Sequence, residues 1–273
     1  MQTARIAAQE LNNQQESTDQ PGIYLQEWLE KCPQNACLPE TILIILDIDD
    51  TVLTTPHGQW LGSSAMFYGL LAETQQQYPG WTRKQAAEHI DVLLSAIYPR
   101  VPLQLTDTSL PQTLHTLRDK GFRVSGMTSR GLGVKDVTLW QLQQANIEFM
   151  GTQFSSPHTT LNEPSIRIES GVVFVGHGNT KGDILKKLLA KEPQFQNIEK
   201  VIVIDDRQKH LDDIQSSVTD REIVTVLCSY PQSRVPYNNE QGRVQMKAFL
   251  EQWRDDAVIG HLINNDRYTQ SLL

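Results

Sequence analysis

Short apolar runs, each followed by polar or acidic residues, restrict the possible fold of this chain more than any other feature. The first run, residues 41–46, is mostly β-branched and ends at an acidic cluster. It is too short for a typical helix and is typical of a strand buried on both faces of a parallel sheet. Runs of similar character follow at 122–127, 172–175 and 201–204, with a possible further one at 223–227.

Helical patterns lie between these runs. Leu110, Leu114 and Leu117 share one helix face, and the pattern stops at Gly121 just before a predicted strand. Residues 134–145 and 182–191 also have helical spacing. Alternation of strands and helices predicts an α/β fold with a Rossmann-like, doubly wound, mostly parallel sheet.

Residues 58–105 interrupt the alternation. Two helices are predicted there, at 65–77 and 83–98, with Thr82 as the N-cap of the second, and no convincing strand. We interpret 58–105 as a small all-helical cap inserted into a core formed by 41–57 and 106–273. Residues 1–20 are interpreted as a solvated arm, followed by a short helix within 23–37, so that 1–40 precede the core. A further amphipathic helix is expected within 239–256.

Composition excludes several classes of protein. The 273 residues carry 24 Lys and Arg against 32 Asp and Glu, a net charge of −8, so a broad basic face for nucleic acid is not expected. No apolar run approaches the roughly 20 residues of a membrane span, and no signal-peptide core is visible at the start. We expect a cytoplasmic protein, with export by a non-Sec route left open. Three cysteines fit a reducing compartment better than a disulfide framework, and Cys32 and Cys37 have no second pair with which to complete a zinc site.

The densest chemical signal is the segment from Asp47 to Thr51, directly after the first predicted strand. Ligands of open α/β sheets bind beyond the carboxyl ends of the strands, and crowded carboxylates there favour a hard cation such as Mg²⁺. A second acid pair, Asp205 and Asp206, follows the run at 201–204. An Asp-rich turn that caps a helix is the alternative for each cluster, but two such strand ends together indicate one shared metal site.

Two further segments suit an anion. Thr128 and Arg130 follow the run at 122–127 and offer a hydroxyl group and a guanidinium group. Lys181 lies at the predicted start of a helix, where the helix dipole disfavours a cation, so that a functional role competes with that of a solvated lysine. Arg130 is expected either to hold a second substrate anion or to form a salt bridge within the fold.

With these residues in place, the sequence resembles the haloacid dehalogenase (HAD) superfamily of phosphatases that use an aspartate nucleophile. The resemblance covers about residues 41–215 and rests on four motifs in the family's order. These are D-x-D-x-T at Asp47, Asp49 and Thr51, a strand that ends in Thr128, a helix that starts near Lys181, and the acid pair Asp205 and Asp206. The insert resembles that superfamily's C1-type helical cap.

The resemblance implies a role for each residue. Asp47 would attack phosphorus and form an aspartyl-phosphate, and Asp49 would act as general acid and then base. Thr128 and Lys181 would bind phosphoryl oxygens.

The same resemblance implies a Mg²⁺ ion. Its ligands would be the Asp47 carboxylate, the Asp49 carbonyl oxygen and Asp205, with Asp206 orienting metal-bound water or Lys181. These implied roles make the expected protein a phosphatase that depends on Mg²⁺.

Other residues are weaker candidates. His57 and Trp60 lie at the junction of the first motif and the insert, where they would face the leaving group of the substrate, or where Trp60 would anchor the insert to the core. Thr51 is a further candidate for substrate contact. His177 is interpreted as structural more readily than as a substrate contact.

The sequence therefore predicts a phosphohydrolase whose substrate is a phosphorylated small molecule or a phosphoprotein. A phosphotransferase or mutase on the same scaffold, and a non-catalytic binding protein that keeps the fold, are the alternatives. The sequence does not predict the oligomeric state.

Overall fold

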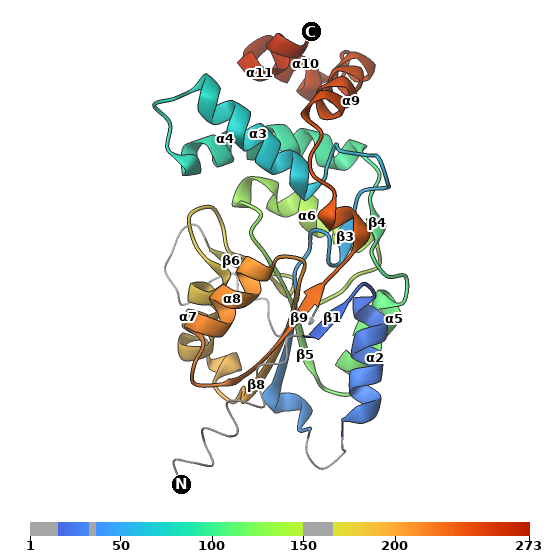
Figure 1. Cartoon of the computed structure of the whole chain (residues 1–273), viewed down its shortest axis with the longest axis vertical. Coiled ribbons are helices and arrows are strands. Elements are labelled where there is room, and N and C mark those ends of the chain that lie inside the picture. Colours follow the sequence, from blue (N-terminus) through green and yellow to red (C-terminus); the bar gives the residue numbers. More distant parts are fainter. Residues whose placement is uncertain (1–15, 33–36, 150–165) are drawn as a thin grey trace.

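The computed structural model describes residues 16–32, 37–149 and 166–273, which form a lower α/β layer and an upper helical layer (Figure 1). The lower layer contains a seven-stranded sheet of order β1-β9-β8-β2-β5-β7-β6. Among the described strands of this sheet, β6 runs antiparallel to its neighbour β7 and all other neighbouring pairs are parallel. The strands are β1 (Glu16–Thr18), β2 (Ile42–Leu46), β5 (Arg123–Thr128), β6 (Arg167–Glu169), β7 (Val172–Phe174), β8 (Lys200–Asp205) and β9 (Glu222–Cys228). The expected α/β fold with a mostly parallel sheet is confirmed.

Helices cover both faces of the sheet. On one face lie α2 (Pro21–Lys31), α5 (Leu110–Asp119) and α6 (Lys135–Gln144), and on the other lie α7 (Lys181–Lys191) and α8 (Gln208–Ser217). All five residues of β2 are buried. Successive side chains of a strand point to opposite faces of the sheet. Ile44 therefore belongs to the apolar cluster on the α5 side of the sheet, and Ile45 belongs to the apolar cluster on the α7 side. A strand apolar at every position is thus explained by two covered faces.

The upper layer is built from two parts of the chain that lie far apart in sequence. The inserted helices are α3 (Ser64–Gln77) and α4 (Arg83–Ile97), and they pack with α9 (Asn239–Gln252), α10 (Ala257–Asn265) and α11 (Arg267–Leu272) in one apolar cluster. Thr82 is the N-cap of α4, as expected, and forms a capping box with Gln85. The predicted core included residues up to 273, whereas the structure places the C-terminal helices with the insert.

Three local expectations differ from the structure. Within the expected solvated arm, Glu16–Thr18 form an edge strand on β9, held by backbone pairing that needs no apolar pattern; residues 1–15 lie outside the described residues. The end of the insert forms a strand, β4 (Gln104–Leu105), which pairs with β3 (Leu53–Thr54) just before the insert. This pairing brings the start and the end of the insert together. The helix expected within 23–37 begins at Pro21 and ends at Lys31, and positions 33–36 lie outside the described residues.

The cysteines also differ from expectation. Cys32 and Cys37 form a disulfide, and their Cα atoms lie 6.1 Å apart, within the range that a disulfide bridges. The interpretation of the cysteine count as typical of a reducing compartment is therefore contradicted for this pair. Cys228 is a free, buried thiol.

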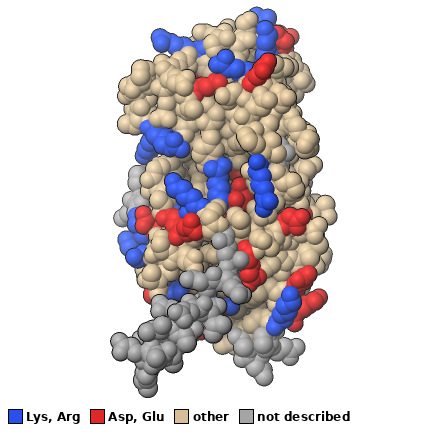
Figure 2. Space-filling view, in the orientation of Figure 1, with Lys and Arg blue, Asp and Glu red and all other residues tan. Residues whose placement is uncertain are grey.

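None of the helices in the described part of the chain combines the length and the apolarity that crossing a bilayer requires. On the face shown in Figure 2, basic and acidic side chains are interspersed, and several basic side chains lie together across the middle of the molecule. The expectation that nucleic acid is not a partner stays a prediction.

Gly182→Ala is expected to destabilise the fold, because α7 and α8 approach each other closely at this glycine. A Cβ atom there would overlap the backbone carbonyl of Asp213 and lie 2.8 Å from its carbon. Overpacking of this kind costs about 1–3 kcal/mol, more than the gain of up to about 1 kcal/mol from helix propensity. The melting temperature should fall by several degrees, at roughly 2–4 °C per kcal/mol. Gly80→Ala, whose Cβ meets no atom within 4 Å, is the matched control; equal melting temperatures for the two variants would contradict the close approach.

Candidate active site

The centre of the candidate site is a buried ammonium group between two carboxylates. β2 lies between β5 and β8, so their carboxyl ends place Asp47, Thr128 and Asp205 at one edge of the sheet. Lys181, the first residue of α7, reaches this edge: its Nζ lies 2.6 Å from Asp47 Oδ1 and 2.7 Å from Asp205 Oδ2. The Lys181 side chain is only 2 % exposed. The conflict between a lysine and the helix dipole is thus resolved by two direct ion pairs.

The three charges of this group do not titrate alike. Burial raises the pKa of Asp47 to about 6, against the opposing effect of Lys181. Burial also acts to raise the pKa of Asp205, but Lys181 and His210 outweigh it and lower that pKa to about 2. The pKa values of Asp47 and Asp205 differ in keeping with their contacts. Asp205 also accepts hydrogen bonds from the backbone N–H of Arg207 at 2.9 Å and from His210 Nδ1 at 3.1 Å. Burial alone would lower the pKa of Lys181, but the two carboxylates raise it, so the lysine stays charged.

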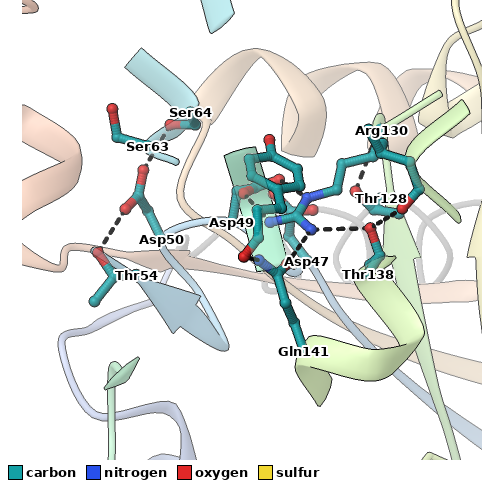
Figure 3. Close-up of polar contacts among 12 residues, drawn as sticks. Asp47, Asp49, Asp50, Thr54, Ser63, Ser64, Thr128, Arg130, Thr138 and Gln141 are labelled. Atoms are coloured by element: carbon teal, nitrogen blue, oxygen red, sulfur yellow. Dashed lines mark hydrogen bonds and ion pairs between the residues drawn. The ribbon is translucent and has the colours of Figure 1, made fainter. Parts of the chain in front are cut away.

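Asp49, two residues after Asp47, is held by Arg130 (Figure 3). Arg130 Nε donates to Asp49 Oδ2 at 3.0 Å and Nη2 donates to Oδ1 at 2.8 Å, which is a bidentate pair. The guanidinium group also donates to Thr138 and Gln141 and lies 4.6 Å from the ring centroid of Tyr98. Arg130 therefore forms a salt bridge within the fold, which is one of its two expected roles. This salt bridge restrains the Asp49 carboxylate.

Asp50 connects the segment that carries Asp47 and Asp49 to the insert. Its backbone adopts a φ of 57°, a left-handed conformation that Asp tolerates better than most residues and that turns the chain sharply after β2. Its side chain accepts hydrogen bonds from Thr54 at 2.8 Å and from Ser64, the first residue of α3, at 2.6 Å (Figure 3). The position of α3 is thus tied directly to the turn that presents Asp47 and Asp49.

A small cavity of about 60 Å³, here named the inner cavity, lies between the two layers. Asp47, Asp49 and Arg130 line its lower side, and Phe67, Tyr68 and Tyr98 line its upper side. Arg207 lines it too and stacks on Tyr68 from the insert, with its guanidinium carbon 4.2 Å from the ring centroid. The lower side of the cavity therefore carries acidic groups. Its upper side, formed by Phe67, Tyr68 and Tyr98, is here named the aromatic ceiling.

One group of residues in the described part of the chain has the spacing of a metal site. Ligand atoms of Asp47, Asp205 and His210 all lie within 4.8 Å of one another. His210 was not predicted; a signal for it is present in the sequence, since it follows Asp205 by five residues at the start of a helix. Asp206, expected beside the ligands, is not in this group. The Asp49 carbonyl oxygen as a ligand stays a prediction, while the Asp49 side chain pairs with Arg130.

The donor set fits a divalent cation. Eight Asp, Lys and Arg side chains line the cavity or form ion pairs beside it: Asp47, Asp49, Asp91, Asp205, Asp206, Arg130, Lys181 and Arg207. When all are ionised their sum is −5 + 3 = −2. Burial, followed by the Asp47 and Asp205 carboxylates, raises the pKa of Asp206 to about 9, so Asp206 keeps its proton at neutral pH and the sum becomes −1. Two carboxylates and an imidazole suit Mg²⁺, Mn²⁺ or Zn²⁺, and the ion is not identified by them.

The remaining predicted residues lie in two places. Thr128 is buried at the end of β5 and its hydroxyl oxygen accepts a hydrogen bond from the Arg130 N–H at 3.1 Å. Thr51 is buried, and its carbonyl oxygen accepts a hydrogen bond from Thr106. The structure does not bring His57 or Trp60 to the inner cavity.

His57 is exposed, whereas Trp60 is buried and anchors the insert to α9. Trp60 Nε1 donates to Gln241 at 3.1 Å, its N–H donates to Gln245 at 2.8 Å, and its ring meets the edge of Tyr237. The alternative that Trp60 anchors the insert to the core stays a prediction, because these contacts tie it to α9, which packs with the insert.

The sequence matches, over residues 25–265, a family described as "Protein of unknown function (DUF2608)". Comparison with curated proteins finds no match. The match spans β2 to β9, the insert and the helices α9 and α10, so it covers every residue of the candidate site.

Asp206→Asn is expected to stabilise the metal-free protein in a manner that depends on pH. Because the pKa of Asp206 is raised to about 9 in the folded state from an ordinary value near 4, folding retains a proton that the unfolded chain releases between these values. Stability then falls as pH rises through this window, and an uncharged Asn avoids the loss. With EDTA present, we expect the variant to melt at least about 2 °C above wild type at pH 8 and close to it at pH 4.

The control for this experiment is Asp212→Asn, an exposed position on α8. It removes the same charge outside the site and should not shift the melting temperature in this way. A variant at position 206 that melts with wild type at pH 8 would show that Asp206 is not a destabilising buried acid.

Proposed function

We propose that this chain, which belongs to the DUF2608 family, is a phosphohydrolase that uses Asp47 as the nucleophile on a phosphomonoester. The observation that carries the proposal is the buried Asp47–Lys181–Asp205 group at the carboxyl end of the central strand, open to a cavity that Asp49 also lines. The site of an open α/β sheet lies at this edge. These residues come from three of the four motifs that carry the resemblance to the HAD superfamily, and their convergence in space supports it.

Asp47 is suited to attack on phosphorus. A carboxylate of an aspartate can form a covalent phosphoryl intermediate, which divides hydrolysis into two easier displacements. Its ion pair with Lys181 keeps the carboxylate in place. We propose that the same ammonium group binds an incoming phosphoryl oxygen. With a pKa raised only to about 6, Asp47 is mostly ionised at neutral pH.

We propose Asp49 as the general acid and base, although in this conformation Arg130 holds both of its carboxylate oxygens. Proton transfer to a leaving oxygen requires at least one of these oxygens to be free. Arg130 is therefore expected to exchange one hydrogen bond from Asp49 to the bound phosphate, for which a guanidinium group is well suited. This exchange would couple arrival of the substrate to release of the acid.

A divalent cation held by Asp47 and Asp205, with His210 near them, would supply positive charge that reduces repulsion between the Asp47 carboxylate and the phosphate. We propose Mg²⁺, the usual partner of phosphate in oxygen-rich sites. Asp206 would orient a water molecule or Lys181 beside it.

The upper helical layer is proposed to act as a cap. It forms the aromatic ceiling of the inner cavity and is tied to the segment of Asp47 by the Asp50–Ser64 hydrogen bond. A closed ceiling excludes water from the phosphoryl group, which strengthens the electrostatic interactions beneath it.

Asp47→Asn is expected to remove hydrolysis of an aryl phosphate in the presence of Mg²⁺ while leaving the fold intact, because an amide of similar shape is a poor nucleophile. Loss of at least about 10³-fold in kcat, or about 4 kcal/mol, is expected. Asp212→Asn should retain wild-type activity. Rapidly quenched wild-type enzyme should carry phosphate on Asp47 by mass spectrometry. A folded variant active within about tenfold of wild type would refute the aspartyl-phosphate mechanism.

Removal of the metal is expected to abolish turnover reversibly. EDTA should stop aryl phosphate hydrolysis and added Mg²⁺ should restore it. Asp205→Asn should raise the Mg²⁺ concentration that gives half-maximal rate by about 10–100-fold, because it weakens one carboxylate ligand. Glu222→Gln is the control, because Glu222 is the first residue of β9 and lies at the edge of the sheet opposite to the site. Full activity in excess EDTA would contradict the proposed dependence on a metal.

A further inference from the structure

Two residues line two separate spaces in the structure. Besides the inner cavity, an outer groove of about 310 Å³ is lined by Lys84, Glu88 and Gly133 among others. Asp91 and His177 line both the inner cavity and the outer groove. They therefore lie at the boundary between the candidate site and a space about five times larger.

The size of the inner cavity limits what it can contain. A cavity must offer about 10–15 Å³ of such volume to hold one water molecule, so a cavity of about 60 Å³ has room for only a small group. We expect a phosphoryl group with its oxygens to take up most of it. The leaving group of a larger phosphomonoester must therefore extend beyond the inner cavity, and the outer groove is the adjacent space.

Asp91 and His177 close this boundary by a direct contact between the layers. His177 Nε2 lies 3.0 Å from Asp91 Oδ2, and the two side chains are 11 % and 5 % exposed. Asp91 comes from α4 of the insert, and His177 comes from the loop between β7 and α7. Phe67, also from the insert, stacks on the His177 ring at a centroid distance of 5.7 Å.

Glycines surround this pair. A Cβ atom at Gly131 would overlap both the Asp91 carboxylate and His177 Nε2, and one at Gly133 would lie 2.8 Å from Asp91 Cβ. Gly176 and Gly178, on either side of His177, adopt φ values of 74° and 93°, which glycine adopts without strain. The sequence thus provides room for the pair and a backbone around His177 that other residues would adopt only with strain.

We infer that Asp91 and His177 form a latch that closes the passage between the inner cavity and the outer groove, and that it must part to admit a leaving group larger than the inner cavity. The latch is a specificity device for the hydrolysis proposed above, and its effect on substrates rests on that function. Its effect on access to the inner cavity depends on geometry alone.

Access is tested without catalysis by introducing a cysteine in place of Ser129, which lines the inner cavity, and labelling it. The native cysteines do not compete, since Cys228 is buried and the other two form a disulfide. Ser129→Cys is combined with Asp91→Ala or with Gly131→Ala, which keeps both latch residues but displaces them. Glu88→Ala, one turn earlier on α4 and on the outer groove, is the matched control. Ser216→Cys, exposed on α8, gives the intrinsic rate of each reagent.

With a bulky maleimide, labelling of the thiol introduced at position 129 should accelerate about tenfold or more in both latch variants, as expected when a minor open state of about 0.1–10 % becomes dominant. A Glu88→Ala background should leave the rate within about twofold. Adding Gly131→Ala to Asp91→Ala should give no further acceleration, because both changes open the same contact. Equal labelling rates in all folded variants, or full additivity of the two changes, would overturn the latch.

The effect on substrates is tested by comparing acetyl phosphate with 1-naphthyl phosphate. Asp91→Ala should raise kcat/KM for the naphthyl ester relative to acetyl phosphate by about tenfold. An equal loss for both substrates would assign the pair to general packing and overturn its role in specificity. If no phosphomonoester is hydrolysed while labelling still accelerates, the proposed function fails and the latch stands.

Discussion

One buried ammonium group determines how the lower layer is arranged. Lys181 lies 2.6 Å from Asp47 and 2.7 Å from Asp205, and removing it would leave the buried Asp47 carboxylate without its ion pair, while Asp205 would keep its hydrogen bonds with Arg207 and His210. Such a group is retained only where the backbone fixes every member, and here β2, β8 and the first turn of α7 do so. Gly182, the next residue, allows α7 and α8 to approach each other closely, and helices cover both faces of β2.

Between the layers, contacts combine charge with aromatic rings. Arg130 lies over Tyr98, Arg207 lies over Tyr68, and His177 stacks on Phe67, with the cationic or imidazole group from the lower layer and the ring from the insert in each case. A cation over a ring is worth about 0.5–2 kcal/mol, less than a buried apolar interface of many residues. Such contacts hold the two layers against each other, and each of them contributes little energy on its own.

Local sequence patterns predicted the elements that depend on local physics. The fully apolar run at 42–46, the Thr82 capping box and the helix beginning at Lys181 each follow from a few neighbouring residues. Pairings across long separations were beyond such patterns. Arg130 and Asp49 are 81 residues apart, and neither carries a signal that names its partner.

The same limit applies to larger units. The apolar face of α9 was visible as a pattern, but no pattern indicates that it packs on the insert rather than on the sheet. The strand Glu16–Thr18 pairs only through its backbone, so its side chains gave no sign of it. His210 was missed because a histidine near a helix start has many ordinary roles.

The composite origin of the upper layer has a consequence for the order in which the molecule is completed during synthesis. The strands from β2 to β9 emerge from the ribosome before residue 229, whereas α3 and α4 cannot bury their apolar face fully until Phe249, Leu250 and Ile259 have also emerged. Domains generally fold as units from the N-terminal end during translation. The charged edge of the sheet is therefore assembled while its ceiling is still incomplete, and the growing chain exposes the apolar stripes of α3 and α4 to chaperones for the time needed to translate the last helices.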